Sequence, residues 1–133
     1  MEVQSMETVY KGALTALVSG TTFLLGGFDK AIQILIVLVI IDYLTGIIRA
    51  AVNGKLDSKV GAKGILKKLC IFIVIVVAVQ IENFIGQPET IHNVVAYFYV
   101  VNESISILEN IDDYVPIPEP LRELLNRLKN KGR

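Results

Sequence analysis

Long runs of apolar residues alternate with short polar segments along this chain, and the runs predict helices that cross a membrane. Residues 31–52 are mostly Ile, Leu and Val, and about 20 apolar residues span the hydrocarbon core of a bilayer as a helix. Residues 69–87 hold a nearly unbroken β-branched run. Such a run is helical in lipid, because a lone strand would leave its backbone groups without hydrogen bonds. Residues 91–111 begin apolar and aromatic and end amphipathic, which makes them a third predicted span.

A shorter apolar run, residues 12–28, determines the number of spans. It is rich in Gly, Ser and Thr, and small residues support close helix packing in membranes. The same composition also suits a segment that lies on the membrane surface. The chain has four spans and both termini on one side if this run crosses, and three spans if it does not. We expect no cleavable signal peptide, because Glu2 and Glu7 outnumber Lys11 in the preceding stretch.

The last segment, residues 116–133, is predicted to form a small unit of its own. Pro116, Pro118 and Pro120 prevent the preceding helix from continuing, whereas proline is tolerated in the first turn of a new helix. Leucines then recur at helical spacing, with basic residues elsewhere around the helix. The pattern predicts a basic amphipathic helix. This helix either lies on the membrane surface or packs against the cytoplasmic loop or a sister subunit.

These elements define an all-α fold class: a multispan transmembrane helical protein with three to four spans and a C-terminal basic amphipathic helix. The predicted organisation is an N-terminal segment over residues 1–29, a membrane domain over 30–115 with a basic loop at 53–68, and a tail over 116–133.

The distribution of charge along the chain predicts how the chain is oriented in the membrane. Thirteen Lys and Arg balance thirteen Asp and Glu, yet ten of the thirteen basic residues lie within 53–68 and 119–133. Because basic loops stay in the cytoplasm, both segments are predicted to be cytoplasmic. The basic residues expected to contact the inner membrane surface are Lys55, Lys59, Lys63, Lys67, Lys68, Arg122, Arg127 and Lys129.

Composition narrows the function classes. Apolar residues make up 53% of the 133-residue chain, charged residues 20%, and the mean hydropathy is +0.56. Too few residues remain outside the apolar runs for a separate soluble core. The chain contains no nucleophile-elbow, Walker or zinc-protease motif. With one cysteine (Cys70) and one histidine (His92), both interpreted as structural, we expect no catalytic site, cofactor, metal or disulfide framework. Balanced charge argues against nucleic-acid binding.

Polar residues inside the apolar runs are the candidate functional residues. Asp42, Thr45, Gly46 and Arg49 have the spacing i, i+3, i+4 and i+7, which places them on one helix face. An acid within a membrane is costly, and it indicates a functional site or an interface. The candidate partners of Asp42 are Arg49, Lys30 and the polar stripe of the third span. Alternatively, Asp42 and Arg49 form a purely structural pair that fixes how helices dock.

That polar stripe covers an arc of about 120° on the predicted helix over 91–111. It either marks where the chain leaves the membrane, or faces other copies of the chain or the water of a membrane lesion. One copy with three or four spans has little room for a pore, so a sizeable hole requires many copies. The residues of the stripe are Asn102, Glu103, Ser106, Glu109 and Asn110.

Four short motifs, in this order and at this spacing, resemble those of the toxin secretion/phage lysis holin family. The resemblance covers about residues 30–125 and leaves out the N-terminal segment. The motifs are Asp42-Tyr43-Leu44-Thr45-Gly46, Ser58-x-x-Gly61-x-x-Gly64-Ile65-x-Lys67-Lys68, Asn102-Glu103-x-x-Ser106-Ile107-Leu108-Glu109-Asn110 and Pro116-x-Pro118-x-x-Leu121.

The resemblance implies a multi-pass protein of the bacterial cytoplasmic membrane that assembles with itself in the lipid bilayer. Family members form lesions through which an endolysin or a large toxin leaves the cytoplasm, and the cargo needs no specific binding site. The polar motif residues carry over as interface or lesion-lining positions only. Two other classes fit the residues: an antiholin-like regulator or scaffold, and a subunit of a small ion channel that uses the same acids.

Overall fold

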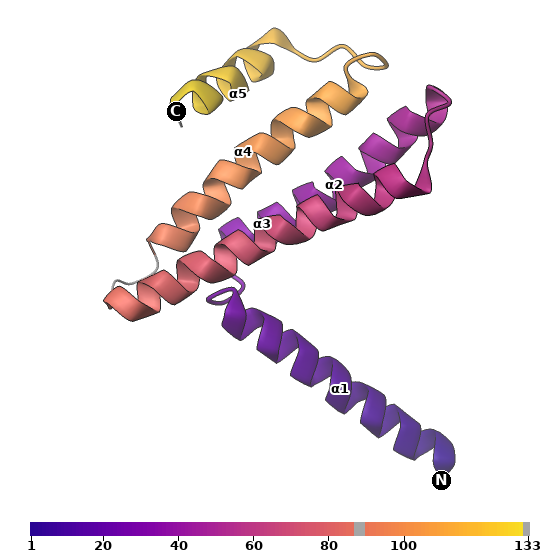
Figure 1. Ribbon diagram of the computed structural model, residues 1–133, viewed down its shortest axis with the longest axis vertical. Helices are drawn as coiled ribbons and strands as arrows, with labels where there is room; N and C mark the ends of the chain where they lie inside the picture. Colours follow the sequence, from indigo (N-terminus) through magenta and orange to yellow (C-terminus); the bar gives the residue numbers. More distant parts are fainter. Residues whose placement is uncertain (87–89, 132–133) are drawn as a thin grey trace.

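The computed structural model describes residues 1–86 and 90–131, and these residues form helices without a strand, which confirms the all-α prediction (Figure 1). Two predicted ends lie outside the described residues: the end of the span over 69–87, at Gln87, and the end of the tail over 116–133, at residues 132–133. The helices are α1 (Glu2–Leu24), α2 (Lys30–Val52), α3 (Ser58–Ile85), α4 (Ile91–Ile111) and α5 (Glu119–Lys131).

Helices α2, α3 and α4 form a bundle in which the chain reverses direction at each turn (Figure 1). The C-terminal end of α2, the N-terminal end of α3 and the C-terminal end of α4 therefore meet at one end of the bundle. Helix α5 folds back beside that end of α4. Helix α1 projects away from the bundle, and none of its residues is buried.

Local capping interactions fix where the bundle helices begin and end. The Asp29 carboxylate accepts a hydrogen bond from the Ile32 backbone N–H at 3.0 Å, which starts α2. The Asp57 carboxylate accepts from the Lys59 N–H at 2.9 Å and starts α3. At the other end of α3, Gly86 adopts the left-handed conformation (φ +70°) that commonly closes a helix.

The expected basic loop over 53–68 was too long: the connection covers residues 53–57, and α3 already begins at Ser58. Charge alone suggested a loop, but the Asp57 cap and the absence of proline allow the helix to form across the lysines. Helix α3 is consequently 28 residues long, or about 42 Å at 1.5 Å per residue.

The bundle has a small core and an apolar exterior. Only 28% of the most apolar stretch of α2 and 22% of that of α3 are buried, so neither is the core helix of a soluble protein. By their length and composition, both are long and apolar enough to cross a membrane. The core consists of Leu25, Ala31, Ile32, Leu35, Val39, Ile71, Ile75 and Ala96.

The turn between α1 and α2 provides a test of the packing. Gly26 has φ +75°, and a Cβ there would lie 3.1 Å from Val79 Cγ2. We predict that Gly26→Ala lowers the free energy of unfolding by about 1–2 kcal/mol, the cost of a left-handed non-glycine residue. Thermal unfolding in detergent, followed by circular dichroism, measures the change. Gly12→Ala, in open space on α1, is the control, and equal stability of both variants would contradict this packing.

Candidate functional site

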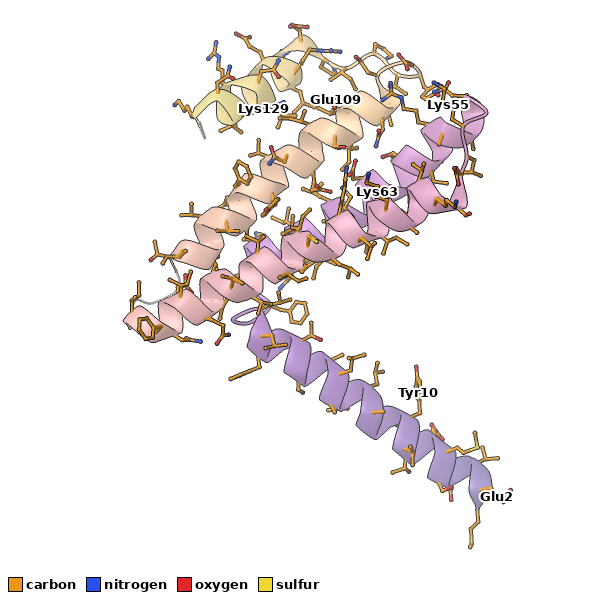
Figure 2. The ribbon with its side chains drawn as sticks, in the orientation of Figure 1. Glu2, Tyr10, Lys55, Lys63, Glu109 and Lys129 are labelled. Atoms are coloured by element: carbon orange, nitrogen blue, oxygen red, sulfur yellow. The ribbon has the colours of Figure 1, made fainter. Side chains whose placement is uncertain are left out.

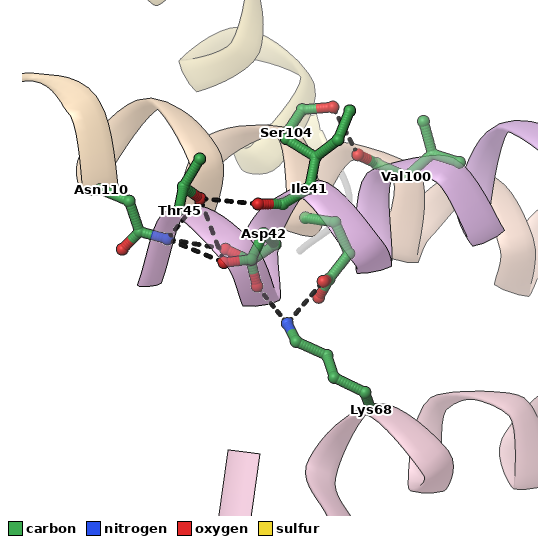
Figure 3. A network of polar contacts seen from close by, with 8 residues as sticks. Ile41, Asp42, Thr45, Lys68, Val100, Ser104 and Asn110 are labelled. Atoms are coloured by element: carbon green, nitrogen blue, oxygen red, sulfur yellow. Dashed lines mark hydrogen bonds and ion pairs between the residues drawn. The ribbon is translucent and has the colours of Figure 1, made fainter. Parts of the chain in front are cut away.

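Three charged side chains from three helices meet inside the bundle. The Lys68 ammonium of α3 forms ion pairs with Asp42 of α2 and with Glu103 of α4, the latter at 2.5 Å from Nζ to Oε2 (Figure 3). The two carboxylate side chains are only 6% and 7% exposed, and the lysine side chain is 20% exposed. A single ammonium, with three N–H donors, therefore pairs with one carboxylate on each of the two neighbouring helices.

An amide from α4 completes the interactions of Asp42. Asn110 Nδ2 donates to Asp42 Oδ1 at 3.0 Å and lies 3.1 Å from Thr45 Oγ1 (Figure 3). The Thr45 hydroxyl donates to the Ile41 carbonyl at 2.8 Å and so remains an acceptor for Asn110. The amide packs close to Gly46, where a Cβ would lie 3.6 Å from Asn110 Nδ2, an ordinary van der Waals distance. We call Asp42, Thr45, Lys68, Glu103 and Asn110 the polar centre.

A second contact holds α2 against the N-terminal half of α3. The Tyr43 hydroxyl donates to the Gly61 carbonyl at 3.4 Å. A Cβ at Gly64 would lie 3.5 Å from Tyr43 Cε2, an ordinary van der Waals distance, so the ring packs close to α3 at this position. The first three sequence motifs therefore contact one another within a single chain.

Other predicted site residues lie outside the polar centre. Arg49 does not contact Asp42; its guanidinium lies 3.7 Å from the Asp113 carboxylate, just after α4. Asn102 and Ser106 are half-buried, and Glu109 is exposed. Of the basic residues assigned to the membrane surface, the exposed ones are Lys55, Lys59, Lys63, Lys67, Arg127 and Lys129.

Lys68 pairs with two carboxylates inside the bundle and does not lie with the surface lysines. The sequence was not read as predicting this pairing. The signal was present in the spacing: Lys68 shares one helix face with Ile71, Ile75, Val79 and Glu82, all of which are buried. The neighbouring lysines lie on other faces. A lysine on the buried face of an apolar helix requires an acidic partner.

A second buried cluster joins the same three helices at the opposite end of the bundle. His92, at the start of α4, donates its backbone N–H to Glu82 Oε1 at 2.7 Å. Its imidazole Nδ1 lies 2.7 Å from Glu82 Oε2, and its Nε2 lies 3.1 Å from Asp29 Oδ2. The sequence analysis interpreted His92 as structural but identified neither acid. The described residues contain no group of His, Cys, Asp and Glu arranged to hold a metal ion.

Helix α5 is tied to the end of α4 by an exposed ion pair. Arg122 donates to both carboxylate oxygens of Asp112, at 2.6 and 3.2 Å. These hydrogen bonds hold the pKa of the Asp112 carboxyl below its ordinary value. Arg122, which was predicted to contact the membrane surface, thus links α5 to the end of α4.

Both buried clusters serve to hold helices together. Within the described part of the chain, every buried side-chain nitrogen and oxygen has a hydrogen-bond partner. Removing one member of a buried ion pair costs more than the intact pair contributes, because it leaves an uncompensated charge. The polar centre therefore gives the three helices one specific arrangement.

An apolar exterior around buried ion pairs defines the chain as a membrane-associated helical bundle. Residues 19–130 match the bacteriophage holin family, and the chain belongs to this family. The match includes the whole polar centre.

Several bacterial proteins are similar to the chain, and those described here are all named as uncharacterized. One from Clostridium perfringens is 42% identical over 113 residues, which cover 84% of each chain. One from Halalkalibacterium halodurans is 36% identical over 130 residues, covering 93% of this chain and 96% of the relative. One from Listeria monocytogenes is 35% identical over 121 residues, covering 90% and 86%. No solved structure matches the chain.

The polar centre makes a direct prediction. Lys68→Met leaves two buried carboxylates without a cation and should lower the free energy of unfolding by about 3–5 kcal/mol. Adding Asp42→Asn and Glu103→Gln to Lys68→Met should recover much of this loss, because no charge then remains buried. Chemical unfolding in detergent measures both effects. Lys67→Met, at the exposed neighbouring position, is the matched control, and equal losses from Lys67→Met and Lys68→Met would contradict the assignment.

Proposed function

We propose that the chain is a holin: a protein that accumulates in the bacterial cytoplasmic membrane, assembles with itself and forms lesions that release an endolysin or a large toxin. Membership of the bacteriophage holin family carries this proposal, since the match extends over residues 19–130. The apolar exteriors of α2 and α3 support it.

The proposed topology has α2, α3 and α4 crossing the bilayer. Their lengths of 23, 28 and 21 residues correspond to about 34, 42 and 32 Å, enough for a hydrocarbon core of about 30 Å. The 53–57 connection and α5 lie toward the same end of the bundle, as the positions of Lys55 and Lys129 indicate (Figure 2). Because basic segments stay inside, we place this end in the cytoplasm.

Many copies are needed for the lesion in this proposal. The space between α2, α3 and α4 is filled by the apolar core and by the polar centre. No folded enzyme passes through such a bundle, so a lesion must form between copies.

The polar stripe of α4 has two states in this proposal. In the resting chain, Glu103 and Asn110 are satisfied by Lys68 and Asp42. A single copy can therefore keep Asp42 and Glu103 paired inside its own bundle, away from acyl chains, where hydrogen-bond partners are lacking. In the assembled lesion, the stripe turns toward water and toward other copies. The two ion pairs of Lys68 oppose this opening and thereby delay it.

Inducible expression in a bacterium tests the function. We predict that coexpression with a cytoplasmic muralytic enzyme causes an abrupt fall in optical density. The enzyme alone should cause no fall, and the chain alone should abolish the membrane potential. Optical density and a potential-sensitive dye are followed together, and a vector without the chain is the control.

Three other outcomes would contradict the proposal. Loss of potential with the enzyme retained inside the cells would indicate an ion channel. An intact membrane, together with one defined protein partner in a pull-down, would indicate an antiholin-like regulator. If neither the membrane potential nor the optical density fell, both a holin and an ion channel would be excluded.

A further inference from the structure

The two ring nitrogens of His92 both face carboxylate oxygens, near the end of the bundle where α2 and α4 begin. Nδ1 lies 2.7 Å from Glu82 Oε2 of α3, and Nε2 lies 3.1 Å from Asp29 Oδ2, just before α2. The imidazole is buried, with 1% of it exposed. A neutral imidazole has a single N–H donor and can donate to only one of the two acids. Both contacts are therefore hydrogen bonds only when the ring or one of the acids carries a second proton.

Local hydrogen bonds place that second proton on the ring. Glu82 Oε1 accepts a hydrogen bond from the His92 backbone N–H at 2.7 Å, at the start of α4. Asp29 Oδ1 accepts one from the Ile32 backbone N–H at 3.0 Å, at the start of α2. Backbone donors and the positive end of a helix both favour a carboxylate over a carboxylic acid. The arrangement is therefore an imidazolium held between two carboxylates.

Loss of this proton opposes the closed arrangement of the helices. A neutral ring leaves one carboxylate facing a nitrogen lone pair, and it leaves both acids without the charge that compensates them. The ion pairs of the described residues bring no other cation to these acids, and Lys30, beside Asp29 in the sequence, is exposed. The other buried acids of the described chain, Asp42 and Glu103, belong to the polar centre. The Asp29 side chain is 33% exposed, which gives the proton a route to water.

We propose that Asp29, Glu82 and His92 form a proton-dependent clamp, which holds α2, α3 and α4 together while the imidazole is protonated and releases them as the pH rises. We call it the histidine clamp. A group that holds a proton in the folded bundle and gives it up on unfolding stabilises the folded state at low pH, and this contribution is lost as the pH rises. The topology proposed above places the clamp at the outer side of the membrane, whereas its dependence on pH does not rest on that topology.

Nitrogen NMR of the imidazole tests the protonation state. His92 is the only histidine of the chain, so ¹⁵N-histidine labelling of the full chain, prepared without a histidine tag, reports on this ring alone. In bilayers at pH 7, both ring nitrogens of the wild type should carry a proton. One protonated nitrogen and one bare nitrogen in the wild type would overturn the proposal.

Two amide variants keep the clamp closed without the extra proton. In Asp29→Asn, the amide oxygen still accepts the Ile32 N–H and the amide nitrogen donates to Nε2 of the ring. In Glu82→Gln, the amide nitrogen donates to Nδ1 instead. The ring should therefore be neutral in both variants at pH 7, with its proton on Nδ1 in Asp29→Asn and on Nε2 in Glu82→Gln. The same tautomer in both variants would contradict this geometry.

The pH dependence of unfolding tests whether the proton controls the clamp. Chemical unfolding of the full chain in detergent is measured from pH 7 to pH 9. Because one proton taken up on folding changes the unfolding constant by up to about tenfold per pH unit, this constant should rise at least about tenfold more in the wild type than in Asp29→Asn.

A matched control separates the clamp from general charge effects. Glu109→Gln neutralises an exposed acid near the other end of α4 and should keep the pH dependence of the wild type. Equal pH dependence in the wild type and in Asp29→Asn would show that the cluster is purely structural and would overturn the proposal. Both measurements use purified protein, so their failure is distinct from a failure to lyse cells.

Discussion

A charged group in apolar surroundings must find a partner, and this constraint organises the whole bundle. Asp42, Lys68 and Glu103 come from three helices, and each would be costly alone in a medium that offers no hydrogen bonds. An arrangement of the helices that separates these three groups would leave a buried charge without a partner. Between lipid-facing helices, where the hydrophobic effect provides no driving force for association, the polar centre supplies the specificity that the small core does not.

The sequence predicts the helices better than it predicts how they contact one another. The apolar run at 31–52 and the run at 91–111 became α2 and α4 almost residue for residue, because their lengths and flanking turn residues are local signals. The start of α3 was missed because a segment rich in lysine is typical of a loop between membrane helices. The polar stripe was named among the candidate partners of Asp42, and Asn110 of that stripe does donate to it. Lys68, which lies 26 residues from Asp42, was not named. The sequence did contain a signal for the buried position of Lys68, because its helical spacing places it on the buried face of α3.

The same comparison changes how the candidate residues are understood. Besides a structural role for Asp42, the sequence predicted interface or lesion-lining positions. Within one chain these residues already belong to a single cluster around Lys68 and Asp42, and they are Asp42, Thr45, Gly46, Glu103 and Asn110. The His92 cluster closes the opposite end in the same way. In the proposed function, lesion formation requires these contacts to open.

The pairing of Lys68 within one chain is the claim on which the account depends most. Solid-state NMR in bilayers can measure the dipolar coupling between ¹⁵N-labelled Lys68 Nζ and ¹³C-labelled carboxyl carbons of Asp42 and Glu103, first undiluted and then with labelled chains diluted into a large excess of unlabelled ones. The account predicts that both couplings persist unchanged on dilution, because all three groups belong to one molecule. Couplings that vanish on dilution would show that the carboxylates are paired between copies and would contradict it.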